Sequence, residues 1–257
     1  MYKDNEFMKS TQEQLRNRGF AFDKDIVLYE GYTENKLLKL LQDKDAYKRT
    51  ISIRLLSKNP QEKYIPLFCE MLKSKEKLYT KLELQNALKA YGEKSIPYLI
   101  PLLGTIGNNH HKKVELIDIK KKSYPCPRDI AGMILIRIGP KVFPELKKML
   151  VEDKKINQIH EAIDLIGHIT GNYRDYSMEK VLVGYYNKHK NNEFMRWKIT
   201  RAFQSFNSRE IKNILENLVR TDHNKIIAEE AKRSIKRIEN RVRAKAPPRC
   251  AAGQTPG

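Results

Sequence analysis

Three stretches of this sequence follow one pattern: YIPLFCEML at residues 64–72, SIPYLIPLL at 95–103 and VFPELKKML at 142–150. In each, a proline follows an aliphatic or aromatic residue, and apolar residues continue at helical spacing. The first prolines of the three stretches are 31 and 47 residues apart, and a 16-residue insertion at Asn108–Ser123 accounts for the longer interval. Periods of this length are typical of stacked helical pairs. We therefore expect an all-α fold, an α-solenoid of about five helical hairpins.

The apolar periodicity on both sides of these stretches predicts where the helices lie. A single amphipathic helix over Lys225–Asn240 is expected to cap the C-terminal end, and Glu34–Leu41 with part of Met1–Phe22 to cap the N-terminal end. Ser95 and Ser208 are predicted N-caps, and Gly139 is predicted to end a helix. The expected pairs are 45–57 with 63–73, 78–91 with 95–103, 128–138 with 141–151, 156–166 with 176–187, and 193–206 with 209–220.

The chain divides by composition into three parts. Residues 1–44 form the expected N-terminal cap region, and residues 45–241 the repeats with the insertion at 108–123. Residues 242–257 lack an apolar period and differ in composition from the Lys-, Ile-, Asn- and Tyr-rich body. We interpret this tail as a cloning remnant or a disordered segment.

Composition narrows the classes of function. The formal charge of the 257 residues is +19 at pH 7, and the body stays basic without the tail. No apolar run reaches the roughly 18–20 residues of a membrane span, and the N-terminus lacks the order of a signal peptide, so a cytoplasmic protein is expected. The three cysteines, Cys69, Cys126 and Cys250, form no CxxC pair. They predict free thiols rather than a disulfide framework or a zinc site.

The chain resembles the HEAT repeat, in particular the short bacterial kind named after phycobilisome lyases. The resemblance lies in helices that end in Ala90-Tyr91-Gly92, Arg137-Ile138-Gly139 or Leu165-Ile166-Gly167, with Ile/Phe-Pro-x-Leu after a short turn in the second and third units. It covers about residues 45–240. It implies a fold used by scaffolds, by chromophore lyases and by a branch of DNA glycosylases, and it implies that second helices line the concave side. Units four and five lack the proline, and the fifth has Asn207 in place of the glycine.

The insertion is the clearest departure from the repeat. Insertions in repeat proteins lie at one edge and often bind partners. Residues 114–119 alternate apolar and acidic positions, which suits a small hairpin strand between basic runs, whereas a solvated loop is the alternative interpretation. His110 and His111 with Asp118 would make a poor metal site because adjacent side chains diverge and no third ligand has the proper spacing. We predict no metal and no cofactor.

The histidines outside the insertion and the single tryptophan are expected to be structural residues, and Cys126 has no evident activating group. His160 and His168 are eight residues apart and do not form an HExxH zinc spacing, so buried structural histidines are expected. Cys126 would need a neighbouring base and a lowered pKa to act as a nucleophile. The single tryptophan, Trp197, is predicted to be a core residue. No residue is assigned a catalytic role.

The basic residues supply the candidate binding site. A positive surface would bind an acidic peptide or follow a phosphate backbone, although a lysine-rich chain also carries solvated charges everywhere. The candidates lie in the predicted second helices, around Trp197 and in the insertion: Lys147, Lys148, Lys180, Lys188, Lys190, Arg196, Arg201, Lys212, Arg220, His110, His111, Lys112, Lys113, Lys120, Lys121 and Lys122.

Two functions follow from these observations. The first is a non-enzymatic scaffold that binds a protein partner with an acidic segment. The second is nucleic-acid binding, for which the resemblance extends to HEAT-like alkylpurine DNA glycosylases that hold DNA in a positive groove lined with tryptophans. The chain has one tryptophan and no Trp and Asp pair that matches that pattern, so the scaffold is the primary prediction.

Overall fold

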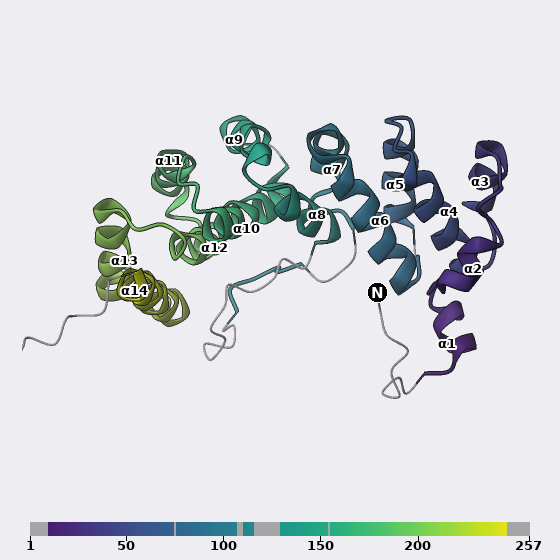
Figure 1. Cartoon of the computed structure of the whole chain (residues 1–257). Coiled ribbons are helices and arrows are strands. Elements are labelled where there is room, and N and C mark those ends of the chain that lie inside the picture. Colours follow the sequence, from purple (N-terminus) through teal and green to yellow (C-terminus); the bar gives the residue numbers. More distant parts are fainter. Residues whose placement is uncertain (1–9, 75, 107–109, 116–128, 154, 246–257) are drawn as a thin grey trace, which may run out of the picture. The chain divides into compact units, whose positions relative to one another are not determined.

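The described part of the chain is all-helical. The computed structural model describes residues 10–74, 76–106, 110–115, 129–153 and 155–245, which contain fourteen α-helices and no strand (Figure 1). The chain divides into two compact units, one of Met1–Asn109 with Pro127–Val142 and one of His110–Cys126 with Phe143–Gly257. An all-α fold was predicted, and the structure confirms it.

Unit 1 holds eight α-helices in which α4, α6 and α8 pack side by side while α3, α5 and α7 lie on one side of them (Figure 1). Isoleucine and leucine side chains fill the core between the helices, and Ile51, Leu72 and Leu84 are fully buried. The helices are α1 (Gln12–Asn17), α2 (Asp23–Val27), α3 (Glu34–Leu40), α4 (Ala46–Lys58), α5 (Tyr64–Lys73), α6 (Leu78–Ala90), α7 (Ile96–Leu99) and α8 (Ile130–Ile138), with short 3-10 turns at Gly92–Ser95, Ile100–Leu102 and Pro140–Val142.

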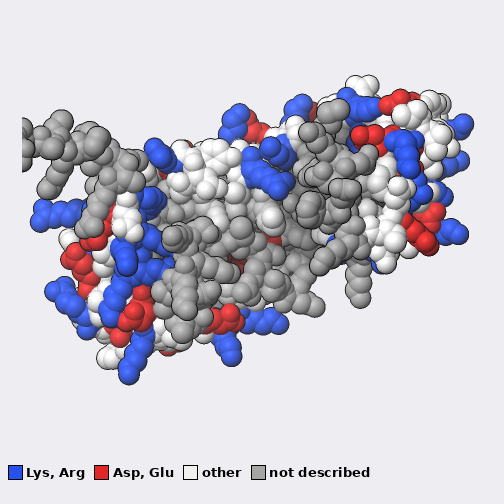
Figure 2. All heavy atoms as spheres, turned by 60° about the horizontal axis from the view of Figure 1, so that its bottom comes forward, with Lys and Arg blue, Asp and Glu red and all other residues white. Residues whose placement is uncertain are grey.

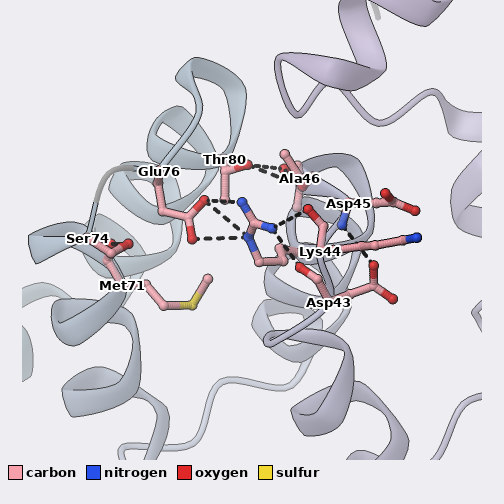
Figure 3. A network of polar contacts seen from close by, with 10 residues as sticks. Asp43, Lys44, Asp45, Ala46, Met71, Ser74, Glu76 and Thr80 are labelled. Carbon is pink, nitrogen blue, oxygen red and sulfur yellow. Dashed lines mark hydrogen bonds and ion pairs between the residues drawn. The ribbon is translucent and has the colours of Figure 1, made fainter.

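Polar contacts set the position of α4 against α6 (Figure 3). The Arg49 guanidinium donates to both carboxylate oxygens of Glu76 and to the carbonyls of Asp43 and Lys44. All three of its nitrogens therefore have partners. Thr50 follows Arg49 in α4, and its buried hydroxyl shares a hydrogen bond of 2.9 Å with the buried hydroxyl of Thr80 in α6. A partly buried arginine held by a bidentate carboxylate and two carbonyls fixes the start of α4.

Asp129 joins the two ends of the insertion. Its carboxylate accepts from the Gly132 amide at 2.9 Å, as an N-cap of α8, and from the Gly104 amide at 2.7 Å. Gly104 has a positive φ of 68°, which a glycine adopts without strain. The Asp129 side chain is completely buried. The chain before the insertion is thus fixed to the helix that follows it.

Unit 2 repeats the arrangement. The layer of α10, α12 and α14 packs side by side, α11 packs on α12 and α13 on α14 (Figure 1). Trp197, Phe203 and Phe206 are fully buried in its core. The helices are α9 (Phe143–Glu152), α10 (Ile156–Tyr173), α11 (Glu179–His189), α12 (Glu193–Phe203), α13 (Arg209–Thr221) and α14 (Lys225–Lys245).

Several predicted boundaries differ from the structure. Helix α10 continues through Gly171 to Tyr173, where a turn was expected, and ends at Arg174 with a φ of 58°. Gly171 suits the helix because a Cβ there would lie 3.1 Å from the Ser205 hydroxyl, so α10 and α12 approach closely. Helix α14 extends past the expected tail boundary to Lys245. Val114 and Glu115 form no strand, and the rest of that predicted strand lies outside the described residues.

The predicted helix caps had different outcomes. Ser208 caps α13 by accepting from the Ile211 amide at 3.2 Å, and Gly139 ends α8 with a φ of 90°, as predicted. Ser95 occupies the N-cap position of α7, as predicted, but its hydroxyl donates to the Gly92 carbonyl of a 3-10 turn and does not accept from an amide of α7.

Replacing Asp129 should destabilise unit 1. Asp129→Ala removes two buried acceptors, and we expect unfolding free energy to fall by about 2 kcal/mol. Urea unfolding followed by circular dichroism measures the change. Asp129→Asn keeps one acceptor oxygen and should lie between Asp129→Ala and the wild type. An Asp129→Ala variant as stable as the wild type would show that these two hydrogen bonds contribute nothing to the stability of unit 1.

Candidate functional site

Charged side chains lie buried along one face of α10, α12 and α14 in unit 2. In each helix they recur at helical spacing, so they share a face with one another. All are at most 8% exposed except Arg237, which is partly exposed. Charged residues are rarely buried unless they are paired. We call this set the charged row: Glu161, Asp164 and His168 in α10, Lys198 and Arg201 in α12, and Glu230, Arg233 and Arg237 in α14.

Asp164 and Lys198 form the centre of the row. The Lys198 ammonium lies 2.6 Å from one oxygen of Asp164, and Arg201 lies 3.8 Å from the other. Burial by itself would raise the pKa of Asp164, but the charges of Lys198 and Arg201 outweigh it and hold that pKa well below its usual range. Asp164 therefore stays ionised at neutral pH and is unsuited to accept a proton as a general base.

Aromatic rings enclose the same cations. The Arg201 guanidinium lies 4.7 Å from the centre of the Trp197 ring, and the His111 ring meets Trp197 edge-on at 5.2 Å. Phe194 stacks on Trp197 at 5.6 Å. Trp197 is fully buried, which confirms the prediction that it is a core residue. Its ring is not open to stack against a nucleic-acid base.

His160 lies beside the row, with its ring edge-on to Phe194 at 4.5 Å. Burial, together with the positive charge of Lys198, lowers the pKa of His160 to about 4, although Asp164 partly opposes the shift. His168 is 8% exposed. Both histidines lie in the packed α10, where structural histidines were predicted.

The α14 end of the row is more basic. Arg233 donates to Glu230 at 3.3 Å, and Arg237 donates to the amide oxygen of Gln204 at 2.5 Å. Burial raises the pKa of Glu230, while Arg233, Arg201 and Arg237 oppose that change. Three arginine charges therefore act on the Glu230 carboxylate, and Arg233 is the one that contacts it.

Most of the lysines predicted to bind lie on α9, α11 and α13, outside the layer of α10, α12 and α14. Lys147 and Lys148 on α9 and Lys180 on α11 are exposed, and Lys212 on α13 is partly exposed. Arg220 and Lys190 are exposed as well. Lys188 is paired with Asp153 at 2.7 Å.

Arg196 and Arg201 do not lie with these lysines. Arg196 is paired with Asp222 at 2.6 Å, and Arg201 is 1% exposed within the charged row. The structure therefore places Arg201 in the interior, where the sequence suggested a surface, because Asp164 of α10 lies opposite it. At the α13–α14 end of unit 2, basic and acidic side chains are interspersed (Figure 2).

The start of the insertion contacts the charged row. His110 lies 3.4 Å from Glu161, and His111 is buried against Trp197, while Lys112 and Lys113 are exposed. Lys120, Lys121 and Lys122 lie outside the described residues, as do Cys126 and Cys250. Within the described ranges, no three His, Cys, Asp or Glu side chains are grouped to hold a metal ion. The histidines thus belong with the row and not with the exposed lysines.

Unit 1 contains one described cysteine, Cys69, and a groove beside Arg49. The Cys69 thiol is free and buried, and burial raises its pKa to about 12, so it is unreactive. A groove of about 750 Å³ lies beside the Arg49 network, between α3 and α5, with Leu38, Leu67 and Met71 in its wall. Because Arg49 already bonds to Glu76 and to two carbonyls, it has little left to offer a ligand.

Sequence reasoning missed the charged row. Arg201 was predicted to lie on a basic surface because a run of charged residues on a helix is usually solvated. The available signal was the acidic pair Glu161 and Asp164 in α10, which is opposite in charge to the basic pair Lys198 and Arg201 in α12. Their pairing across 34 residues, as in Asp164 and Lys198, depends on the stacking of α10 on α12.

Comparison with family models, with curated proteins and with solved structures gave no match for this chain. The HEAT-like assignment therefore remains a prediction. Among the helices of the described residues, none combines the length and the hydropathy that crossing a membrane would require.

Breaking the central ion pair should destabilise unit 2. Lys198→Met leaves Asp164 buried without its closest cation, and we expect a loss of about 3–5 kcal/mol. Urea unfolding followed by the fluorescence of Trp197, the one tryptophan, measures this. The double variant Asp164→Leu with Lys198→Met should lose less than Lys198→Met alone; equal or greater loss would contradict the assigned pairing.

The lowered pKa of His160 predicts a pH dependence. Between pH 6.5 and about 4 the unfolded chain binds a proton that the folded protein excludes, so stability is complete above pH 6.5 and falls as the pH decreases. We expect this histidine to contribute about 2–3 kcal/mol of that fall. His160→Gln should flatten the decrease, seen in urea unfolding at several pH values. The exposed His223 supplies the control, since His223→Gln should leave the profile unchanged.

Proposed function

We propose that the chain is a HEAT-like helical-repeat scaffold of about five hairpins that binds a protein partner with an acidic segment. The binding surface is the layer of α9, α11 and α13 in unit 2. The scaffold works without chemistry of its own and needs no cofactor. The support comes from charge placement, because the resemblance itself fits many functions.

Regularly spaced lysines without partners carry this proposal. Lys148, Lys180 and Lys212 follow one another at intervals of 32 residues, one on each of three successive helices of the layer. None of the three has an ion-pair partner among the described residues. Lysines that compensate neighbouring acids would be paired, as Lys188 is with Asp153. A series of unpaired lysines, one on each of these helices, suits the binding of an extended acidic segment.

Nucleic-acid binding is the alternative function, because the same unpaired series would suit a phosphate backbone. Base stacking, however, would require exposed aromatic rings, and Trp197 is fully buried. The acidic peptide is therefore the preferred ligand.

Charge reversal tests the proposal. We expect Lys148→Glu with Lys180→Glu and Lys212→Glu to weaken binding of a fluorescent Glu-rich 16-residue peptide at least tenfold, because three attractive contacts become repulsive. Fluorescence anisotropy at about 50 and 200 mM salt measures the affinity, with duplex and single-stranded DNA as parallel ligands.

A matched control separates the site from net charge. Lys39→Glu with Lys77→Glu and Lys89→Glu changes three exposed lysines of unit 1 by the same total charge. This variant should bind the peptide like the wild type. Absence of peptide binding, or equal weakening by both triple variants, would refute the proposed surface, and tight DNA binding with a steep salt dependence would support the alternative.

A further inference from the structure

Two exposed tyrosines and two exposed arginines lie together at one edge of unit 2. Tyr173 is the last residue of α10, Arg174 follows it directly, and Tyr176 lies in the turn before α11. Arg241 is a residue of α14. All four side chains are exposed. We call these four residues the Tyr-Arg patch.

Contacts with the end of α12 bring the patch together. The ring centres of Tyr176 and Phe206 are 6.3 Å apart, and one terminal nitrogen of Arg241 donates to the Ser205 carbonyl at 3.2 Å. Arg241 is close enough to interact electrostatically with both Tyr176 and Arg174. Because Arg174 and Arg241 repel each other, an anion bound beside them would be stabilised by both charges.

The tyrosine rings of the patch are open to solvent. Tyr173 is 46% exposed and Tyr176 is 41% exposed, more than any other Tyr, Phe or Trp in the described part of unit 2. On α9, α11 and α13, where the proposed lysine surface lies, the Tyr and Phe rings are all buried: Phe143, Tyr185 and Tyr186. An exposed ring offers a face on which a nucleic-acid base can stack.

Arg174 occupies a backbone position that favours glycine. Its φ of 58° and ψ of 31° are left-handed, and a residue with a Cβ is strained there. The usual residue after a helix in this conformation is glycine or asparagine. The Arg174 side chain makes no hydrogen bond or ion pair within the described part of the chain, so no such contact there offsets the strain. A strained residue with an exposed charge indicates a functional contact.

We propose that the Tyr-Arg patch binds single-stranded nucleic acid. Bases stack on Tyr173 and Tyr176, and phosphates pair with Arg174 and with the exposed part of the Arg241 guanidinium, which has five N–H donors. A duplex covers the faces of its bases, so an unpaired strand fits the rings better. An acidic peptide would use the arginines but would leave the rings without a role.

This inference goes beyond the proposed protein-binding surface, which lies on α9, α11 and α13. Neither proposal depends on the other, because the two surfaces share no residue. One carboxylate accompanies the two arginines: Asp175 lies between them and Tyr176 in the chain, and it accepts from the Ser177 amide at 2.9 Å. The patch therefore keeps a net positive charge.

Fluorescence anisotropy with a labelled DNA strand of about twelve nucleotides tests the patch. At about 50 mM salt we expect the single strand to bind at least tenfold more tightly than the duplex with its complement, because only unpaired bases reach the rings. Equal affinity for the two forms, or no binding of the single strand, would overturn the proposal.

Variants of the tyrosines separate stacking from charge. Tyr173→Ala with Tyr176→Ala should weaken binding of the single strand at least tenfold, whereas Tyr173→Phe with Tyr176→Phe should keep the wild-type affinity because the rings remain. Tyr98→Ala is the matched control, since Tyr98 is a 44% exposed tyrosine of unit 1, and it should bind like the wild type. Unchanged affinity in the double alanine variant would contradict stacking.

Arg174→Gly separates binding from stability. Glycine relieves the left-handed strain, so the Tm should be equal to or above that of the wild type. The slope of log affinity against log salt between about 50 and 200 mM should become less steep by about 0.7, the value of one lost phosphate contact on a single strand. An unchanged slope would show that Arg174 does not contact phosphate. This variant keeps the test decisive even where the double alanine variant fails to fold.

Two further results would assign the ligand elsewhere and overturn the proposal. The first is loss of single-strand binding in the Lys148→Glu, Lys180→Glu and Lys212→Glu variant together with wild-type binding in the double alanine variant, which would place nucleic acid on the lysine surface. The second is equal weakening of the Glu-rich peptide and the DNA strand by the double alanine variant, which would make the patch a protein-binding surface.

Discussion

The contact between Lys198 and Asp164 is the interaction on which the rest of unit 2 depends. Lys198 has no exposed surface, so its charge must be compensated inside the protein, and the partner 2.6 Å away lies on a different helix. A hydrophobic contact would tolerate sliding of α12 along α10, whereas a buried ion pair does not, because a small shift leaves two charges unpaired. The pair thereby sets the register of the layer. Arg201 lies beside the same carboxylate and against the Trp197 ring, and His111 of the insertion packs on the Trp197 ring as well.

The polar contacts that hold adjacent helices in register differ between the two units. In unit 1, neutral hydroxyls of Thr50 and Thr80 lie between α4 and α6, and the Arg49 to Glu76 pair is at the edge. In unit 2, the contact between α10 and α12 is the buried ion pair of Lys198 and Asp164, whereas α14 donates to neutral oxygens of Thr200 and Gln204. Charges concentrated in the interior are weak evidence for stability, since apolar side chains of the same size often do better.

The sequence predicted the helices better than the site. Apolar periodicity and helix-ending residues such as Gly139 are local signals, so nearly every helix lies within a few residues of its expected range. The prediction of a turn at Gly171 was wrong because Ser205, 34 residues further along the chain, lies so close to α10 that a glycine is favourable inside the helix. Contacts between residues far apart in the sequence also explain why the buried charged residues of unit 2 were not predicted. Exposure of Lys148 or Lys180 follows from the local pattern, whereas burial of Arg201 depends on a carboxylate in another helix, which periodicity does not reveal.

The order of the two units along the chain has a consequence for synthesis. The described residues His110–Glu115 belong to unit 2, yet the chain then returns to unit 1 for α8 before the rest of unit 2 begins. His111 therefore leaves the ribosome 86 residues ahead of Trp197, the ring against which it packs. At roughly 5–20 residues per second this interval lasts on the order of 10 s. During that time the helix that carries Trp197 has not been made, so the segment around His111 is exposed to chaperones and to misfolding.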